Sequence, residues 1–161
     1  MKIRYICFDM DGTVADLYAV PNWLAMLRAE DTTPYRVAKP MVDIPQLRVL
    51  LRMLQERGIE NHILTWLSMG SSKDYEERTS ATKIEWLSAH QWQFDGFHSM
   101  TYGMCKADVI RNWLAPGEVA ILFDDSKAVR DSWDLGPAID PAEVDIIQYL
   151  WGLLGKTPTP I

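Results

Sequence analysis

The stretch IRYICF at residues 3–8, followed at once by DMDGT at residues 9–13, decides the fold. Its β-branched and aromatic residues are typical of a short buried strand that ends on an acidic turn. The same pattern returns at residues 119–123, where VAILF runs into Asp124-Asp125. A continuous apolar run of this kind favours a strand that is covered on both faces. The two stretches therefore predict buried strands that each end in carboxylates.

The segments between these strands carry the spacing of amphipathic helices. Residues 43–57 predict a helix whose buried face carries Leu47, Leu50, Leu51 and Leu54. Further strands are predicted at residues 60–65, 97–102 and 138–139. Further helices are predicted at residues 22–28, 73–90, 106–114 and 127–135.

Two helices are predicted in more detail. The helix over residues 73–90 is expected to bury Tyr75, Ile84, Trp86 and Leu87. The last helix is expected to open at Asp140, because Asp140 can cap it, a proline follows in the first turn, and Glu143 is a reciprocal capping partner. Its inner stripe would consist of Ile146, Ile147, Leu150 and Leu154.

Strands that alternate with helices imply a parallel sheet with helices on both faces, a three-layer Rossmann-like α/β fold. The length of 161 residues favours a single domain over residues 1–161. The irregular residues 16–40 would form a small insert after the first strand. Residues 156–161 are expected to be a loose tail.

The composition is that of an ordinary globular protein, with 48% hydrophobic and 24% charged residues. The net charge of -6 argues against binding to a nucleic-acid backbone. The N-terminal sequence does not have the pattern of a signal peptide, and no stretch is apolar and long enough to span a membrane. We therefore expect a cytoplasmic protein without a membrane partner. The sequence leaves both a monomer and a homodimer open.

Reactive side chains follow four of the predicted strands. They are Asp9 and Asp11 after the first strand, Thr65 at the end of the second, Lys106 after the third, and Asp124 and Asp125 after the fourth. In parallel α/β sheets the carboxyl ends of the strands form one crevice. Several carboxylates in one cleft repel one another unless a cation neutralises them, and hard oxygen ligands favour Mg²⁺.

The same set of groups suits phosphate chemistry. One carboxylate can serve as a covalent nucleophile, and a second one two residues later can protonate the leaving oxygen and then activate water. Thr65 offers a hydroxyl to a phosphate, its neighbour Trp66 offers a backbone N–H, and Lys106 offers a positive charge. Lys83, in the preceding helix, is the alternative lysine for this role.

The four ordered stretches FDMDGT, the Thr65 strand end, Lys106 in CKADVI and the acidic pair in ILFDDS resemble the motifs of the haloacid dehalogenase superfamily. The match runs from about residue 3 to residue 140. The resemblance implies that Asp9 is the nucleophile and Asp11 the general acid/base, with its backbone carbonyl on Mg²⁺. It also implies that Asp124 binds the metal directly and Asp125 binds it through water. Asp9, Asp11, Asp124 and Asp125 would thus form the metal site, and Thr65, Trp66 and Lys106 would bind phosphate.

A narrower resemblance rests on KIEWLSAH, before the third strand, and DDSKAVRDSWDLGPAIDP, after the fourth, which are similar to small 5′-nucleotidase-like phosphatases of phage and bacteria. It implies a small phosphorylated substrate such as a nucleoside monophosphate. Aromatic residues in the insert, Tyr18, Trp23 and Tyr35, could stack on a flat leaving group. Packing within the insert explains them equally well.

A catalytically weak binding or regulatory protein with the same fold, and a phosphatase acting on nucleic-acid ends, remain the alternatives. A receiver-type signalling domain would have its acidic pair first, which is not the order found here. No P-loop motif occurs, which excludes that class of nucleoside triphosphatase.

Overall fold

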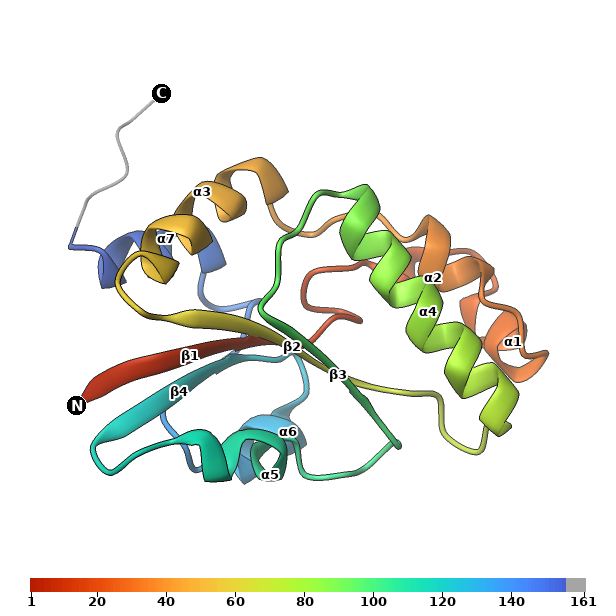
Figure 1. Cartoon of the computed structure of the whole chain (residues 1–161). Coiled ribbons are helices and arrows are strands. Elements are labelled where there is room, and N and C mark those ends of the chain that lie inside the picture. Colours follow the sequence, from red (N-terminus) through yellow and green to blue (C-terminus); the bar gives the residue numbers. More distant parts are fainter. Residues whose placement is uncertain (156–161) are drawn as a thin grey trace.

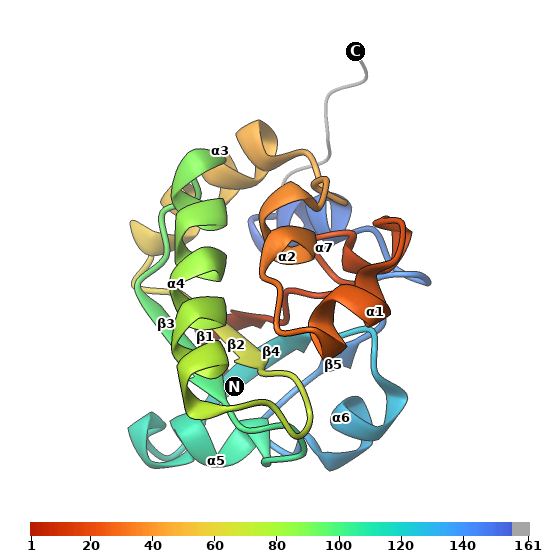
Figure 2. The ribbon, with the colours of Figure 1, turned by 90° about the vertical axis from the view of Figure 1, so that its right-hand side faces the viewer.

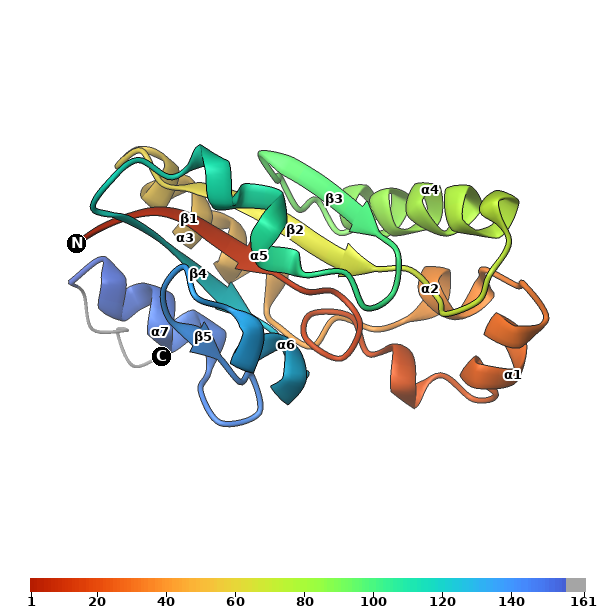
Figure 3. The same cartoon turned by 90° about the horizontal axis from the view of Figure 1, so that it is seen from below.

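The computed structural model, which describes residues 1–155, is built on a five-stranded parallel sheet in the order β3-β2-β1-β4-β5. The strands are β1 (Lys2–Phe8), β2 (Glu60–Trp66), β3 (Gly96–Met100), β4 (Glu118–Phe123) and β5 (Ala138–Ile139). The α-helices are α1 (Trp23–Arg28), α2 (Thr33–Val37), α3 (Ile44–Gln55), α4 (Lys73–Ala89), α5 (Lys106–Ile110), α6 (Lys127–Ser132) and α7 (Ile146–Leu153), with 3-10 turns η1 (Leu17–Ala19) and η2 (Arg111–Trp113). Helices cover both faces of the sheet (Figures 1 and 3). The predicted three-layer Rossmann-like α/β fold is confirmed.

The alternation of side chains along β1 creates the two cores. Ile6 and Phe8 belong to the larger core, which also contains the inner faces of α3 and α7. Tyr5 and Cys7 belong to the second core, under α5 and α6. Because successive strand residues point to opposite faces, one apolar strand can bind helices on both sides.

The order of the strands places a crevice at the end of β1. From β1 the chain adds β2 and β3 on one side and then returns to add β4 and β5 on the other. Such a reversal leaves a crevice at the carboxyl ends of the strands, where α/β proteins bind their ligands. β1 is thus the central strand of the sheet.

The segment between β1 and α3 lies in front of the carboxyl ends of the strands. Figure 2 shows α1 and α2 beside α4 at this end of the molecule. Leu17, Tyr35 and Tyr75 form a small core between the segment and α4. The Tyr75 hydroxyl also donates a hydrogen bond of 2.8 Å to the carbonyl of Asp31. The segment is therefore fixed to α4 next to the crevice.

The last helix was predicted to begin too early. The carboxylate of Asp140 accepts from the Ala142 N–H and pairs with Arg130, so residues 140–143 form a turn. α7 begins at Ile146, and its cap is Asp145, which accepts from the Gln148 N–H. The expected tail at residues 156–161 lies outside the described residues.

Three other helices also differ from the prediction. The helix expected at residues 106–114 tightens into η2 after Ile110, and α6 ends at Ser132 rather than at residue 135. On α4, Ile84 is 39% exposed, while Lys83 is completely buried. Lys83 is buried because it donates hydrogen bonds to groups at the crevice, which are described below. No helix within residues 1–155 combines the length and apolar character that a bilayer-spanning helix requires.

Candidate active site

Carboxylates from two neighbouring strands meet at the carboxyl edge of the sheet. Phe8 at the end of β1 lies opposite Phe123 at the end of β4, and the residue that follows each strand is an aspartate. Asp9 and Asp124 are both buried, with 7% and 1% of their surface exposed. Oxygens of these two carboxylates and of Asp125 lie within 4.8 Å of one another. The register of the sheet therefore assembles the acidic cluster that the sequence predicted.

The ammonium group of Lys106 joins the two buried carboxylates. Lys106 is the first residue of α5, and its Nζ lies 2.8 Å from Asp9 Oδ1 and 2.7 Å from Asp124 Oδ2. Burial by itself lowers the pKa of Lys106, but Asp9 and Asp124 outweigh burial and the net pKa is raised. Lys106 therefore stays positively charged and offsets part of the negative charge.

The turn after β1 ties Asp9 to the other strand end. The Thr13 hydroxyl lies 3.1 Å from Asp9 Oδ2 and 3.3 Å from Asp125 Oδ1, and it also accepts from the Asp125 N–H. Gly12 has a φ of 80°, and a Cβ there would lie 2.4 Å from Asp125 Oδ2 and 2.6 Å from the Tyr18 ring. Glycine is thus required both by the left-handed backbone and by the close side chains.

The acidic cluster fits a divalent cation. Three carboxylates, those of Asp9, Asp124 and Asp125, lie together, and the Lys106 ammonium group contacts two of them, Asp9 and Asp124. Burial, followed by the charge of Asp9, raises the pKa of Asp124 to about 6 and that of Asp125 to about 7. Excess negative charge and hard oxygen donors are the conditions under which Mg²⁺ binds to proteins. The carboxylates of Asp9, Asp124 and Asp125 are thus brought together as predicted. Asp11 was predicted to offer the metal only its backbone carbonyl, and its carboxylate pairs with Lys83.

The second aspartate of the turn, Asp11, forms an ion pair with a different lysine, Lys83. Lys83 Nζ, on α4, lies 2.9 Å from Asp11 Oδ2. Burial raises the pKa of Asp11, and the neighbouring Lys83 charge acts in the opposite direction. From the sequence, Lys83 was the alternative to Lys106 as the lysine that binds phosphate. The structure places both lysines in the site, Lys106 on Asp9 and Lys83 on Asp11.

Thr65 and Trp66 lie at the end of β2, beside Lys83. The Thr65 hydroxyl accepts from Lys83 Nζ at 2.7 Å, and the Trp66 carbonyl accepts from it at 3.0 Å. Thr65 is fully buried and, within the described chain, does not belong to the wall of the pocket, whereas Trp66 does. Their binding to phosphate stays a prediction.

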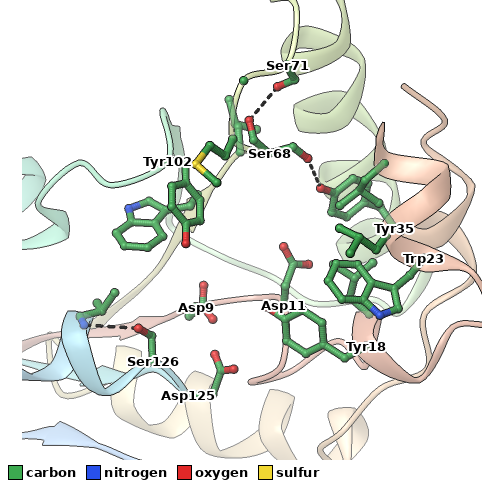
Figure 4. A pocket seen from close by; sticks show the side chains of 18 of the residues that line it. Asp9, Asp11, Tyr18, Trp23, Tyr35, Ser68, Ser71, Tyr102, Asp125 and Ser126 are labelled. Atoms are coloured by element: carbon green, nitrogen blue, oxygen red, sulfur yellow. Dashed lines mark hydrogen bonds between the residues drawn. The ribbon is translucent and has the colours of Figure 1, made fainter. Parts of the chain in front are cut away.

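An open pocket of about 650 Å³ lies over the acidic turn. Asp9, Asp11 and Asp125 form its floor (Figure 4). Two aromatic pairs stand on opposite sides, Tyr18 with Trp23 at 5.0 Å between ring centroids, and Trp66 with Tyr102 at 4.8 Å. Such walls suit a flat apolar group whose charged end reaches the floor.

The three aromatic residues predicted for the insert differ in their availability. Tyr18 is 51% exposed, and Trp23 is partly buried, so both present ring surface to the pocket. Tyr35 is only 5% exposed, its hydroxyl lies 2.7 Å from Ser68 Oγ, and Lys83 lies over its ring. Tyr35 therefore serves mainly to pack the insert against the strand ends.

The aromatic wall formed by Trp66 and Tyr102 was not predicted from the sequence. Trp66 was considered only for its backbone, and Tyr102 was treated as the end of a strand. The signal that could have identified them is their position, because Trp66 ends β2 and Tyr102 follows β3 at the same edge of the sheet as Asp9.

Comparisons with known proteins bear on the fold. No protein-family model matches this chain, and no curated protein sequence matches it. Among solved structures, a chain of the Pnkp1/Rnl/Hen1 RNA repair complex is similar with a TM-score of 0.55 and 17% identity, over 87% of this chain and 42% of that one. The protein described here thus spans less than half of that chain.

A second similar structure is D,D-heptose 1,7-bisphosphate phosphatase from Burkholderia thailandensis, with a TM-score of 0.48 and 12% identity. The match covers 97% of this chain and all of that one. At these identities the likeness concerns the fold and not the activity. The likeness to the chain of the RNA repair complex is a likeness of fold alone. Neither comparison bears on the narrower resemblance to 5′-nucleotidases.

Proposed function

We propose that this protein is a Mg²⁺-dependent phosphomonoesterase that works through an aspartyl-phosphate on Asp9. The observation that carries the proposal is the setting of Asp9 on the floor of an open pocket. Its two oxygens are held by Lys106 at 2.8 Å and by Thr13 at 3.1 Å, beside a second buried carboxylate. A carboxylate fixed in this way is suited to attack a phosphorus atom rather than merely to cap a turn.

Two steps follow from this arrangement. In the first, an Asp9 oxygen bonds to phosphorus, the bond from phosphorus to the ester oxygen breaks, and the protonated Asp11 gives its proton to the leaving alcohol. In the second, water attacks the phosphorus, Asp11 takes a proton from that water, and the bond between Asp9 and phosphorus breaks. The two steps consume one water and return both aspartates to their starting states.

The remaining groups bind and orient the phosphate. Lys106, which donates to two carboxylates, has a third N–H that could reach a phosphate oxygen. Mg²⁺ bound by Asp9, Asp124, the backbone carbonyl of Asp11 and, through water, Asp125 would neutralise negative charge on the phosphate and the carboxylates. Thr65 and Trp66 are proposed to orient the phosphate from the end of β2.

We propose nucleoside monophosphates as the preferred substrates. In this hypothesis residues 16–40 act as a small cap, and its Tyr18 and Trp23 contact the base, with Tyr35 packed behind them. Stacking on aromatic side chains is sequence-tolerant and suits any base. The pocket is open to one side, so other small phosphate esters also fit the proposal.

The test is phosphate release from nucleoside 5′- and 3′-monophosphates, ribose 5-phosphate, an aryl phosphate and an oligonucleotide with a terminal phosphate. Each is assayed with Mg²⁺ and with EDTA, for the wild type and for Asp9→Asn. Release that needs Mg²⁺ and is lost in Asp9→Asn, with a preference for nucleotides, would support the proposal. Preference for the oligonucleotide would favour action on nucleic-acid ends. No release by the folded wild type would favour a binding protein.

A further inference from the structure

Lys83 is a buried lysine that joins four parts of the molecule. It is on α4, completely buried, and its Nζ donates to Asp11 Oδ2 at 2.9 Å, to the Thr65 hydroxyl at 2.7 Å and to the Trp66 carbonyl at 3.0 Å. Its Nζ also lies 4.9 Å from the centre of the Tyr35 ring. The lysine thus connects the turn after β1, the end of β2, the insert and α4.

The number of donors distinguishes the two lysines of the site. An ammonium group has three N–H donors. Lys83 spends all three on protein acceptors, so none remains for a phosphate oxygen. Within residues 1–155, Lys106 donates to only two side chains, those of Asp9 and Asp124, and keeps one N–H for the substrate. A role for Lys83 must therefore act through its partners and not by direct contact with the substrate.

Asp11 is the partner that has a chemical task. Lys83 holds Oδ2 of Asp11, and within the described residues Oδ1 makes no hydrogen bond. Figure 4 shows the Asp11 carboxylate pointing from the floor into the space between Tyr102 and Tyr35. One oxygen is anchored, and the other is left free on the side of the pocket. An anchored carboxylate loses less rotational freedom on the way to the transition state.

We propose that Lys83 is a positioning residue that fixes the Asp11 carboxylate for proton transfer to the leaving group. This inference rests on the proposed function, because Asp11 must be the general acid. Lys83 donates one N–H to Asp11 and two to groups at the end of β2. It therefore fixes the position of the Asp11 carboxylate relative to the end of β2, which is proposed to bind the phosphate. The contact with Tyr35 links the same lysine to the insert over the pocket.

The test uses the leaving group. A nucleoside 5′-monophosphate releases an alkoxide, which needs a proton, whereas 2,4-dinitrophenyl phosphate releases a phenolate that leaves without one. The quantity compared is kcat/KM, because it covers the steps up to departure of the leaving group. For Lys83→Met, we expect kcat/KM on the nucleotide to fall by about 10²- to 10⁴-fold, the range of general acid catalysis. On the dinitrophenyl ester the fall should be less than about tenfold.

Two controls accompany the variant. Lys127→Met removes an exposed lysine that pairs with Asp131, and it should leave both rates unchanged. Lys83→Gln keeps N–H donors on a shorter side chain, and it replaces Lys83→Met in the same comparison if thermal melting shows that the methionine variant is not folded. It should show the same dependence on the leaving group in a weaker form.

The outcomes separate this inference from the proposed function. If the wild type hydrolyses neither ester with Mg²⁺, the proposed function fails. If the wild type is active and the Lys83 variant loses both rates equally, Lys83 is merely structural and the inference is wrong. An unchanged rate on both esters also overturns it. A selective loss on the nucleotide supports it.

Discussion

Lys106 and Asp124 form a buried ion pair of 2.7 Å, and the same ammonium lies 2.8 Å from Asp9. Lys106→Met would leave two buried carboxylates without this partner. We expect kcat/KM to fall by at least about 10²-fold, as when a preorganised charge is removed from a site. In EDTA at pH 8 the free energy of unfolding should fall by about 3 kcal/mol, the low end for breaking a buried pair. The loss should be smaller at pH 5, where Asp124, whose pKa is raised to about 6, binds a proton.

The measurement is chemical denaturation in EDTA at both pH values, together with the nucleotide assay. Lys127→Met is the matched control, because its lysine is exposed. An unchanged stability at pH 8 would contradict the idea that Lys106 neutralises the acidic cluster.

The raised pKa values of Asp124, about 6, and Asp125, about 7, predict how Mg²⁺ stabilises the protein. Each carboxyl binds its proton more tightly in the folded state than in the unfolded chain. Without metal, these two groups therefore favour folding at pH 4, and that contribution is lost as the pH rises through 6 and 7. A bound cation removes the repulsion between the ionised groups.

The melting temperature measured with and without Mg²⁺ should thus differ more at pH 8 than at pH 5. The quantity to compare is the difference in melting temperature with and without Mg²⁺ at each pH. Other carboxylates and histidines titrate under both conditions, so their effect cancels in this difference. Asp125→Asn should reduce the effect of Mg²⁺ at pH 8. A larger stabilisation by Mg²⁺ at pH 5 would show that the cation binds elsewhere.

Two histidines, one on β2 and one on β3, stack on each other. His62 Nδ1 lies 3.1 Å from His98 Nε2, and Trp113 lies beside both rings. Burial and then His62 lower the pKa of His98 below 6.5. The fold therefore favours neutral His98, and this contribution is present above pH 6.5 and is lost as the pH falls through the lowered value.

We expect His98→Gln to flatten the loss of stability between pH 7 and pH 5, measured as the free energy of unfolding in urea. His90→Gln is the control, since His90 packs against Trp86 and not against another histidine. If both variants follow the wild-type curve, the His62–His98 pair does not contribute to acid sensitivity.

Much of this arrangement could be predicted from the sequence, because short-range patterns determine it. A nearly continuous apolar run predicted that β1 is covered on both faces, and the acids directly after β1 and β4 had to meet once those strands paired in parallel. The start of α7 could not be predicted in this way. The sequence at Asp140 has the pattern of a helix cap, but in the structure Asp140 pairs with Arg130 instead. That ion pair joins residues of different elements, so the local sequence does not reveal it.

The position of Lys83 is a second case in which a distant partner decided the outcome. On α4, the spacing places Lys83 on the same face of the helix as Tyr75, Thr79 and Trp86, which are all buried. That spacing was the available signal, but a lysine on an apolar face is normally read as exposed. Its burial depends on Asp11, which is 72 residues away in the chain.

The aromatic pair of the insert gives the last prediction. Trp23 packs edge-on against Tyr18, and both line the pocket. If they contact a base, Trp23→Ala should lower kcat/KM for a nucleoside 5′-monophosphate by about tenfold, which corresponds to a stacking contribution near 1.4 kcal/mol. Ribose 5-phosphate, which has no base, should be hydrolysed at the wild-type rate. Tyr35→Phe, which removes only the hydroxyl that meets Ser68, is the matched control and should leave the ratio of the two rates unchanged. An equal loss on both substrates in Trp23→Ala would mean that the pair only packs the insert, and the preference for nucleotides would then need another explanation.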